Sequence, residues 1–170
     1  RGIQPSTVIL AGHGSPGVIT MGMDPEQGNS SALVGADWSL DEAMDMPGIS
    51  TIDIASDPTF AQLFALMKPD SQGLCRVVLH SCYQGSGSDY YEPVAASIAH
   101  TMAVARSDTA GVVYASPAPV REKDIIIEDD KAWLGAWTKQ FSTVYHEFSG
   151  EYEVVERPVD PPAEAMKMAA

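Results

Sequence analysis

Two short apolar runs end in turns rich in glycine and serine, and both turns carry a chemically reactive side chain. The first run covers residues 7–11 and passes into the turn Gly-His-Gly-Ser-Pro-Gly, which contains His13. The second covers residues 75–81 and passes into Cys82, followed by a Gly/Ser-rich loop. Runs of this length bounded by turn residues are typical of buried strands. Because ligands bind at the carboxyl ends of strands in open α/β sheets, we expect His13 and Cys82 to belong to one site.

Two segments with helical spacing of apolar residues follow strands in the chain. The first covers residues 57–67, where Asp57 is a good N-cap and Pro58 occupies the first helical position. The second opens at Pro93, runs to residue 102, and precedes an apolar strand at residues 110–115. The alternation of strands and helices predicts right-handed crossovers between parallel strands. We therefore expect an α/β fold with a mostly parallel central sheet and helices on both faces.

The segments outside this alternation give weaker patterns. Residues 17–21 predict a second strand, paired as a hairpin with residues 7–11. Residues 23–47 are rich in Gly, Asn, Ser, Asp and Met, and predict a long surface loop with at most a short helix at residues 40–44 behind Ser39. Such a loop faces a substrate or partner, or is a tolerated insertion.

In the C-terminal part, residues 125–127 predict a hairpin or a loop with a short strand. Asp130 can cap a helix whose apolar face would contain Trp133, Leu134, Trp137 and Phe141. Residues 143–148 predict a strand or an extension of that helix, and residues 152–155 predict another strand. From Arg157 on, prolines and a polar tail predict a frayed end, so we expect one domain at residues 1–156 and a flexible tail at residues 157–170.

Composition and charge narrow the range of partners and protein classes that fit the chain. The hydrophobic fraction of 45% predicts a globular domain, and the net charge of −13 with only ten lysines and arginines disfavours nucleic-acid and membrane partners. No apolar run approaches the ~18 residues of a membrane span. The two cysteines, Cys75 and Cys82, lie at opposite ends of one predicted strand, roughly 20 Å apart at strand rise. We expect both to be free thiols, which fits a reducing compartment.

Several kinds of chemistry fit the pattern less well. The glycines at residues 12–17 match a dinucleotide-binding pattern, with Asp37 about twenty residues on, but an apolar strand follows them where a helix is needed. The histidines and cysteines lack the short paired spacing of zinc sites, so we expect no metal and no cofactor. No nucleophile elbow is present, and we expect Ser81 to point away from Cys82 and to bond within the turn.

A cysteine and histidine pair remains. A thiol in a glycine-rich loop can react, the helix that begins at Pro93 could direct its positive end toward a thiolate, and glycines 85 and 87 leave amides accessible for an oxyanion. The alternative is structural: Cys82 is a small buried hydrophobe and His13 a turn residue with a satisfied ring.

These two motifs resemble those of the caspase-like cysteine peptidase clan, which includes caspases, metacaspases, legumain, gingipain and clostripain. The resemblance covers roughly residues 5–120: an apolar strand ending in His13-Gly14-Ser15, then one ending in Ser81-Cys82 and, after two residues, Gly85-Ser86. It implies a three-layer sandwich of caspase-like form. Metacaspases usually have an acidic residue two positions before the cysteine, whereas this chain has His80, so a preference for a basic substrate residue is not implied.

The resemblance also implies roles for individual residues. Cys82 would be the nucleophile, His13 the acid that protonates the leaving amine, and the backbone amides of Gly14 and Cys82 the oxyanion donors. We further expect substrate contacts at Ser116, Gly12 and Ser81, and in the loop from Ser116 to Arg121.

The predicted function is that of a cysteine endopeptidase, which cleaves a protein or peptide substrate or its own parent chain. A parent polypeptide or an activating partner is expected. The acidity and the Arg1 start suggest a protease domain from a larger bacterial effector or toxin, secreted and acting in a reducing compartment, or else cytoplasmic. Two alternatives stay open: an inactive caspase-like binding or scaffold domain, and a non-peptidase acyl-transfer hydrolase.

Overall fold

A computed structural model of the protein describes residues 2, 4–24, 29–35, 49–89, 91–128, 131–135 and 137–159. Within these ranges, sheet A has five strands in the order β1-β6-β7-β10-β11. Their bounds are β1 (Thr7–Ala11), β6 (Cys75–His80), β7 (Gly111–Ala115), β10 (Thr138–His146) and β11 (Glu151–Val159). The β1–β6 and β6–β7 pairs are parallel, and β7–β10 and β10–β11 are antiparallel. The prediction of a mostly parallel sheet is therefore right for only half of the strand pairs.

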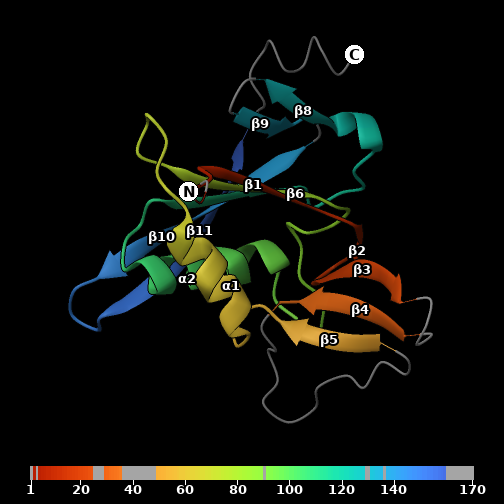
Figure 1. Ribbon diagram of the computed structural model, residues 1–170, viewed down its shortest axis with the longest axis horizontal. Helices are drawn as coiled ribbons and strands as arrows, with labels where there is room; N and C mark the ends of the chain where they lie inside the picture. The colour runs from red at the N-terminus through yellow and green to blue at the C-terminus, as the bar shows by residue number, and fades with distance from the viewer. Residues whose placement is uncertain are drawn as a thin grey trace.

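Sheet B has four strands and lies beyond the carboxyl end of β1 (Figure 1). Its strands follow the order β2 (His13–Ser15), β3 (Val18–Asp24), β4 (Asn29–Val34) and β5 (Ile49–Asp53). The chain leaves sheet A at Gly12 and enters sheet B at His13, so the predicted hairpin between residues 7–11 and 17–21 is wrong. Instead, β3 pairs with β2, while β1 pairs with β6.

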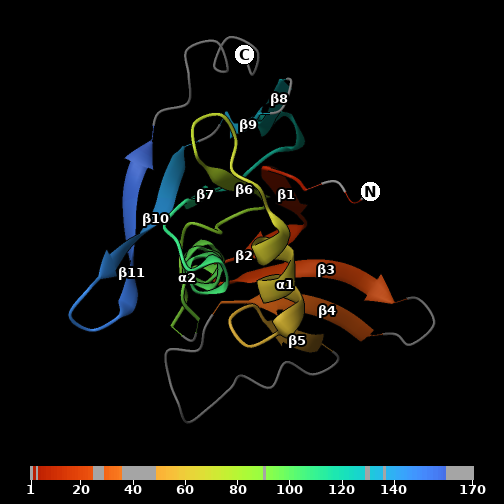
Figure 2. The same ribbon diagram turned by 60° about the vertical axis from the view of Figure 1, so that its left-hand side comes forward.

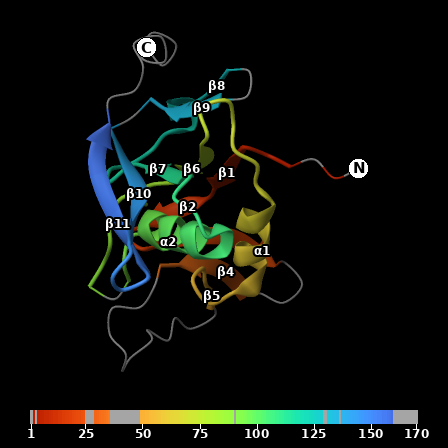
Figure 3. The ribbon, with the colours of Figure 1, turned by 90° about the vertical axis from the view of Figure 1, so that its left-hand side faces the viewer.

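Both helices lie on one face of sheet A, which corrects the prediction of helices on both faces. Helices α1 (Pro58–Leu66) and α2 (Val94–Arg106) pack side by side, and the ribbon of β8 (Ile125–Glu128) and β9 (Lys131–Leu134) covers the opposite face (Figures 2 and 3). Strand alternation explains the two layers. Val77 and Leu79 of β6 belong to the cluster that contains the helices, whereas Val78 packs with Leu134 of β9. Residues of the hairpin thus bury the face that a helix was expected to cover.

The N-terminal helix forms as its sequence predicts. The Asp57 carboxylate accepts a 2.8 Å hydrogen bond from the Thr59 amide, and Pro58 begins the helix. At the other end, the Arg106 side chain of α2 donates to the Phe64 carbonyl and to the Met67 carbonyl, which lie where α1 ends. One long cation therefore satisfies helix-end acceptors and ties the two helices together.

The second helix begins where expected, one residue after Pro93, but runs four residues past the predicted end to Arg106. The strand predicted at residues 110–115 is confirmed as β7, and the one at residues 75–81 as β6. No helix in the described ranges is long and apolar enough to cross a membrane.

Two other predictions are wrong. The first is the expected loop at residues 23–47, part of which is strand β4. The short helix expected at residues 40–44 lies outside the described residues and stays a prediction. The helix expected after Asp130 is replaced by β9 and β10. In β9, buried Ala132 and Leu134 alternate with half-buried Trp133, and this fits a strand as well as a helix. Pairing of β10 with β7 and β11 decides between the two.

The hairpin at residues 125–127 is confirmed as β8–β9. The strand predicted at residues 143–148 is the last part of β10, which ends two residues earlier at His146, and the strand predicted at residues 152–155 lies within β11. Strand β11 reaches Val159, so the first residues of the expected tail pair with β10. Residues 160–170 lie outside the described part of the chain.

A core substitution tests this packing. Phe64 of α1 is 0% exposed, whereas Leu66 on the same helix is 59% exposed. We expect Phe64→Ala to lower the free energy of unfolding by about 3–5 kcal/mol, because it removes a buried aromatic ring and leaves a cavity. Leu66→Ala should change it by less than about 1 kcal/mol. Urea denaturation of the two variants measures the difference, and equal losses would contradict the described packing.

Candidate active site

The parallel pairing of β1 and β6 brings the two predicted site segments together. Ala11 is the partner of His80 in the ladder, and the Gly12 amide donates to the His80 carbonyl at 3.5 Å. Paired residues in neighbouring strands project to the same face of a sheet. The ladder ends at this pair, and the segments that follow it carry His13 on one side and Cys82 on the other.

A glycine makes this approach closer than any other residue would allow. A Cβ atom at Gly14 would overlap the carbonyl oxygen of Cys82, the hydroxyl of Ser81 and the side-chain amide of Gln84. The backbone that follows His13 therefore lies directly against the backbone that carries the thiol.

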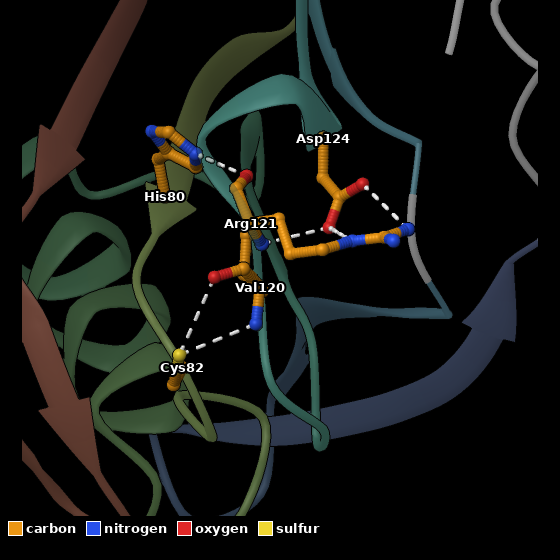
Figure 4. Close-up of polar contacts among 5 residues, drawn as sticks. All are labelled: His80, Cys82, Val120, Arg121 and Asp124. Carbon is orange, nitrogen blue, oxygen red and sulfur yellow. Dashed lines mark hydrogen bonds and ion pairs between the residues drawn. The ribbon is translucent and has the colours of Figure 1, made fainter. Parts of the chain in front are cut away.

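The sulfur of Cys82 is half-buried and contacts the backbone of Val120 (Figure 4). The Val120 amide donates to Sγ at 3.2 Å, and the thiol donates to the Val120 carbonyl at 3.4 Å. Among the described residues, no hydrogen bond joins Sγ to His13 or His80. The thiol is thus held by the main chain, on the side of β6 that faces β8 and β9.

The segment that carries Val120 is itself firmly attached to the thiol-bearing turn. The Gly85 amide donates to the Ser116 carbonyl at 2.9 Å, and the Tyr83 amide donates to the Ala118 carbonyl at 3.1 Å. Beyond Val120, the buried Asp124 carboxylate accepts a 2.7 Å bond from the Arg121 amide and pairs with the Arg121 guanidinium (Figure 4). Asp124 lies in a short 3-10 helix, η1 (Glu122–Asp124), that precedes β8.

The two histidines differ in their surroundings. The His13 side chain is exposed, and its ring has no hydrogen bond to any described residue. Nε2 of His80 lies 3.0 Å from the Arg121 carbonyl, and because a carbonyl only accepts, Nε2 is the protonated ring nitrogen in that contact (Figure 4). His80 and Cys82 thus contact adjacent residues of one segment, whereas His13 contacts neither of them by a hydrogen bond among the described residues.

The other predicted site residues have structural contacts. Ser81 and Ser116 are buried, and the Ser116 hydroxyl accepts a 3.1 Å bond from the Ala118 amide. The expected bond of Ser81 within the turn is wrong, because its hydroxyl has no hydrogen-bond partner among the described residues. Gly12 is exposed at the end of β1. The substrate contacts expected for these three residues, and the oxyanion roles of the Gly14 and Cys82 amides, stay predictions.

Two expectations about the thiol's surroundings are corrected. The Gly85 amide is bonded to Ser116, so it is not accessible for an oxyanion. At the start of α2, the Ala95 amide donates to the Gln84 carbonyl at 3.4 Å, and the amide that reaches the sulfur belongs to Val120. A neighbouring loop, and not the helix terminus, provides the donor.

The backbone at the thiol has an unusual conformation. Tyr83, directly after Cys82, has a φ of 61°, in the left-handed region that non-glycine residues seldom occupy. Such residues concentrate at functional sites, where the surrounding structure holds them in place. Tyr83 was not predicted to take part, and Val120 was expected only within the loop from Ser116 to Arg121, as a substrate contact. Their contribution is through the main chain, which leaves no pattern in the sequence.

Cys75 is unlike Cys82, although both thiols are free. It is 0% exposed at the start of β6, and burial raises its pKa, while the Arg106 guanidinium acts in the opposite direction. Burial excludes reagents, and the raised pKa keeps Cys75 in the unreactive thiol form. No cluster of three or more possible metal ligands occurs in the described ranges.

The difference between the two thiols predicts selective alkylation. We expect iodoacetamide at pH 7.5 to modify folded protein once, at Cys82, and to reach Cys75 only after denaturation. Peptide mapping by mass spectrometry locates the modification, and Cys82→Ala should remove it. Modification of Cys75 first would contradict the described burial.

The close approach at Gly14 predicts that a single methyl group disturbs the site. We expect Gly14→Ala to cost about 1–3 kcal/mol of unfolding free energy, because the hairpin must move away from Cys82. Its alkylation rate at Cys82 should also change. Gly73→Ala is the control: it has open space around its Cβ but a φ of 76°, so it should cost about 1 kcal/mol through backbone strain. An unchanged alkylation rate in Gly14→Ala would argue against the contact.

Comparisons of the chain with protein-family models, with curated proteins and with solved structures find no match. The function is therefore inferred from the residues and their geometry.

Proposed function

We propose that the chain is a cysteine endopeptidase of the caspase-like kind, in which Cys82 attacks the peptide bond and His13 transfers the proton. The fold proposed with it is a variant of the caspase-like sandwich. Sheet A is the central layer, α1 and α2 form one outer layer, and the β8–β9 ribbon takes the place of the second helical layer.

One observation carries the proposal. The β2 backbone at Gly14 lies against Ser81 and Cys82, so the strand that holds His13 lies beside the turn that holds the thiol. The shared register of β1 and β6 supports it, since Ala11 and His80 are partners. A nucleophile and its proton-transfer group must be held by the same scaffold, and the ends of two neighbouring parallel strands provide one.

The proposed reaction has two steps. Sγ of Cys82 attacks the carbonyl carbon of the substrate, and the thiol proton passes to the His13 imidazole. As the carbon–nitrogen bond breaks, His13 donates that proton to the leaving amine and a thioester remains on Cys82. Water then hydrolyses the thioester, which releases the carboxylate and restores the thiol. The amides of Gly14 and Cys82 are the proposed donors to the developing oxyanion.

A second candidate is an inactive binding domain with the same fold. The observation in its favour is that Sγ is occupied by the amide and carbonyl of Val120. For the peptidase, the same contact means that a substrate must displace the Val120 backbone from the sulfur. These hydrogen bonds to sulfur are long and weak, so the energy of a bound peptide can break them.

Protein cleavage tests the proposal. We expect the wild-type chain, incubated with a denatured proteome, to generate new peptide N-termini that mass spectrometry identifies. Cys82→Ala should generate none, because the nucleophile is lost. His13→Ala should lower the rate by about 10²–10⁴-fold, the usual contribution of general acid–base catalysis.

His100→Ala is the matched control, since His100 is an exposed histidine on α2 outside the proposed site. It should cleave at the wild-type rate. If wild type and Cys82→Ala produce the same peptide ends, the endopeptidase is excluded and the binding domain is favoured. A thioester substrate in the same assay separates the peptidase from another acyl-transfer hydrolase, which would turn over the thioester alone.

A further inference from the structure

Gln84 has a buried polar side chain that the reaction above does not use. It is 0% exposed, two residues after Cys82. Its Nε2 lies 2.7 Å from the Cys82 carbonyl, 2.9 Å from the Val18 carbonyl and 3.2 Å from the Ser15 carbonyl. Carbonyl oxygens only accept hydrogen bonds, so the nitrogen of the Gln84 side chain, and not its oxygen, must face these three. The orientation of the side-chain amide is therefore fixed.

These three carbonyls belong to the two halves of the site. Ser15 and Val18 flank the tight turn between β2 and β3, and His13 is two residues before Ser15 on β2. The Cys82 carbonyl belongs to the thiol-bearing turn. A single side chain therefore bonds the hairpin that holds the histidine to the turn that holds the cysteine.

A main-chain bond supports the same junction. The Gly17 amide, at the tip of the β2–β3 turn, donates to the Ser86 carbonyl at 3.1 Å. The hairpin cannot slide along the thiol-bearing turn without breaking this bond and those of Gln84. Oε1 of Gln84 has no hydrogen-bond partner among the described residues, so the side chain acts through its nitrogen.

Gln84 also holds the backbone on both sides of Tyr83, the residue beside the thiol that has the left-handed conformation. Its bond to the Cys82 carbonyl fixes the peptide unit that precedes Tyr83, and its own carbonyl accepts from the Ala95 amide at the start of α2. An unfavourable backbone conformation persists only where neighbouring contacts hold it. Gln84 supplies two such contacts, on both sides of Tyr83.

We propose that Gln84 is a positioning residue, whose amide holds the His13 hairpin and the Cys82 turn in the arrangement needed for proton transfer. The inference rests on the proposed peptidase function, because it assigns the residue that aligns that site. Gln84 does not touch the substrate. Its loss should therefore slow the chemical step and leave substrate affinity nearly unchanged.

Two substitutions test the proposal. Gln84→Met keeps a similar volume and removes the donor, and Gln84→Glu places a carboxylate against three carbonyls. We expect both to lower kcat for a cleaved peptide about 100-fold, the effect of a misplacement of roughly 1 Å, with KM changed less than about threefold. Gln62→Glu, on the exposed face of α1, is the matched control and should keep wild-type kcat.

A pH profile of Gln84→Glu separates positioning from a general loss of structure. Protonation of the new carboxyl restores one donor, so kcat relative to wild type should rise as the pH falls from 7.5 to 5.5. Thermal unfolding accompanies every assay, and if Gln84→Glu is unfolded, the kcat of folded Gln84→Met decides. A Gln84→Met protein that is folded and has wild-type kcat would overturn the proposal.

Hydrogen exchange tests the junction without any catalytic assay. We expect the Gly17 amide to exchange at least tenfold faster in Gln84→Met than in wild type, while amides in β7 keep their protection. Unchanged exchange at Gly17 would overturn the positioning role even if the enzyme is active. If wild type cleaves no peptide but Gly17 loses protection, the peptidase proposal fails and the junction stands.

Discussion

The pairing of β1 with β6 is the interaction on which the rest of the structure depends. Its register makes Ala11 and His80 neighbours, and the chain then diverges: one strand end turns into sheet B and the other into the loop toward α2. Gly14 permits the two departing backbones to remain in contact. A shift of this register by one residue would turn Val77 and Leu79 away from the helical core and would separate His13 from Cys82. Core packing and site assembly are therefore determined together.

The site is built mainly from backbone, and main-chain groups contact the sulfur. Main-chain groups of residues 116–120 bind the thiol-bearing turn at Tyr83, Gly85 and the sulfur itself. Asp124 holds the far end of that segment through the Arg121 amide. A peptide that reaches Sγ must compete with this segment, so the proposed activity depends on substrate binding to open the contact with Val120.

Patterns that depend on local physics could be predicted from the sequence: the Asp57-Pro58 helix start, the buried strand at Cys75, and free thiols at Cys75 and Cys82. Elements whose structure depends on pairing with residues far away in the sequence could not be predicted. The apolar residues after Asp130 fit a helix or a strand, and only contact with β7 and β11 makes β10 a strand. The same holds for the site. His13 and Cys82 were predicted from their places at strand ends, and Val120 only as part of the loop from Ser116 to Arg121. The contact of Val120 with the sulfur, and the parts played by Tyr83 and Gln84, depend on main-chain geometry and three-dimensional contacts that no spacing reveals.

The central proposal is that His13, and not His80, which is nearer in the sequence, is the partner of the Cys82 thiol. The most direct measurement is the set of imidazole ¹H–¹³C NMR resonances before and after alkylation of Cys82 with iodoacetamide, assigned by substituting each histidine in turn. The account predicts that the His13 resonance shifts while those of His100 and His146 do not. A shift of the His80 resonance with no change at His13 would contradict the account and would assign His80 as the partner of the thiol.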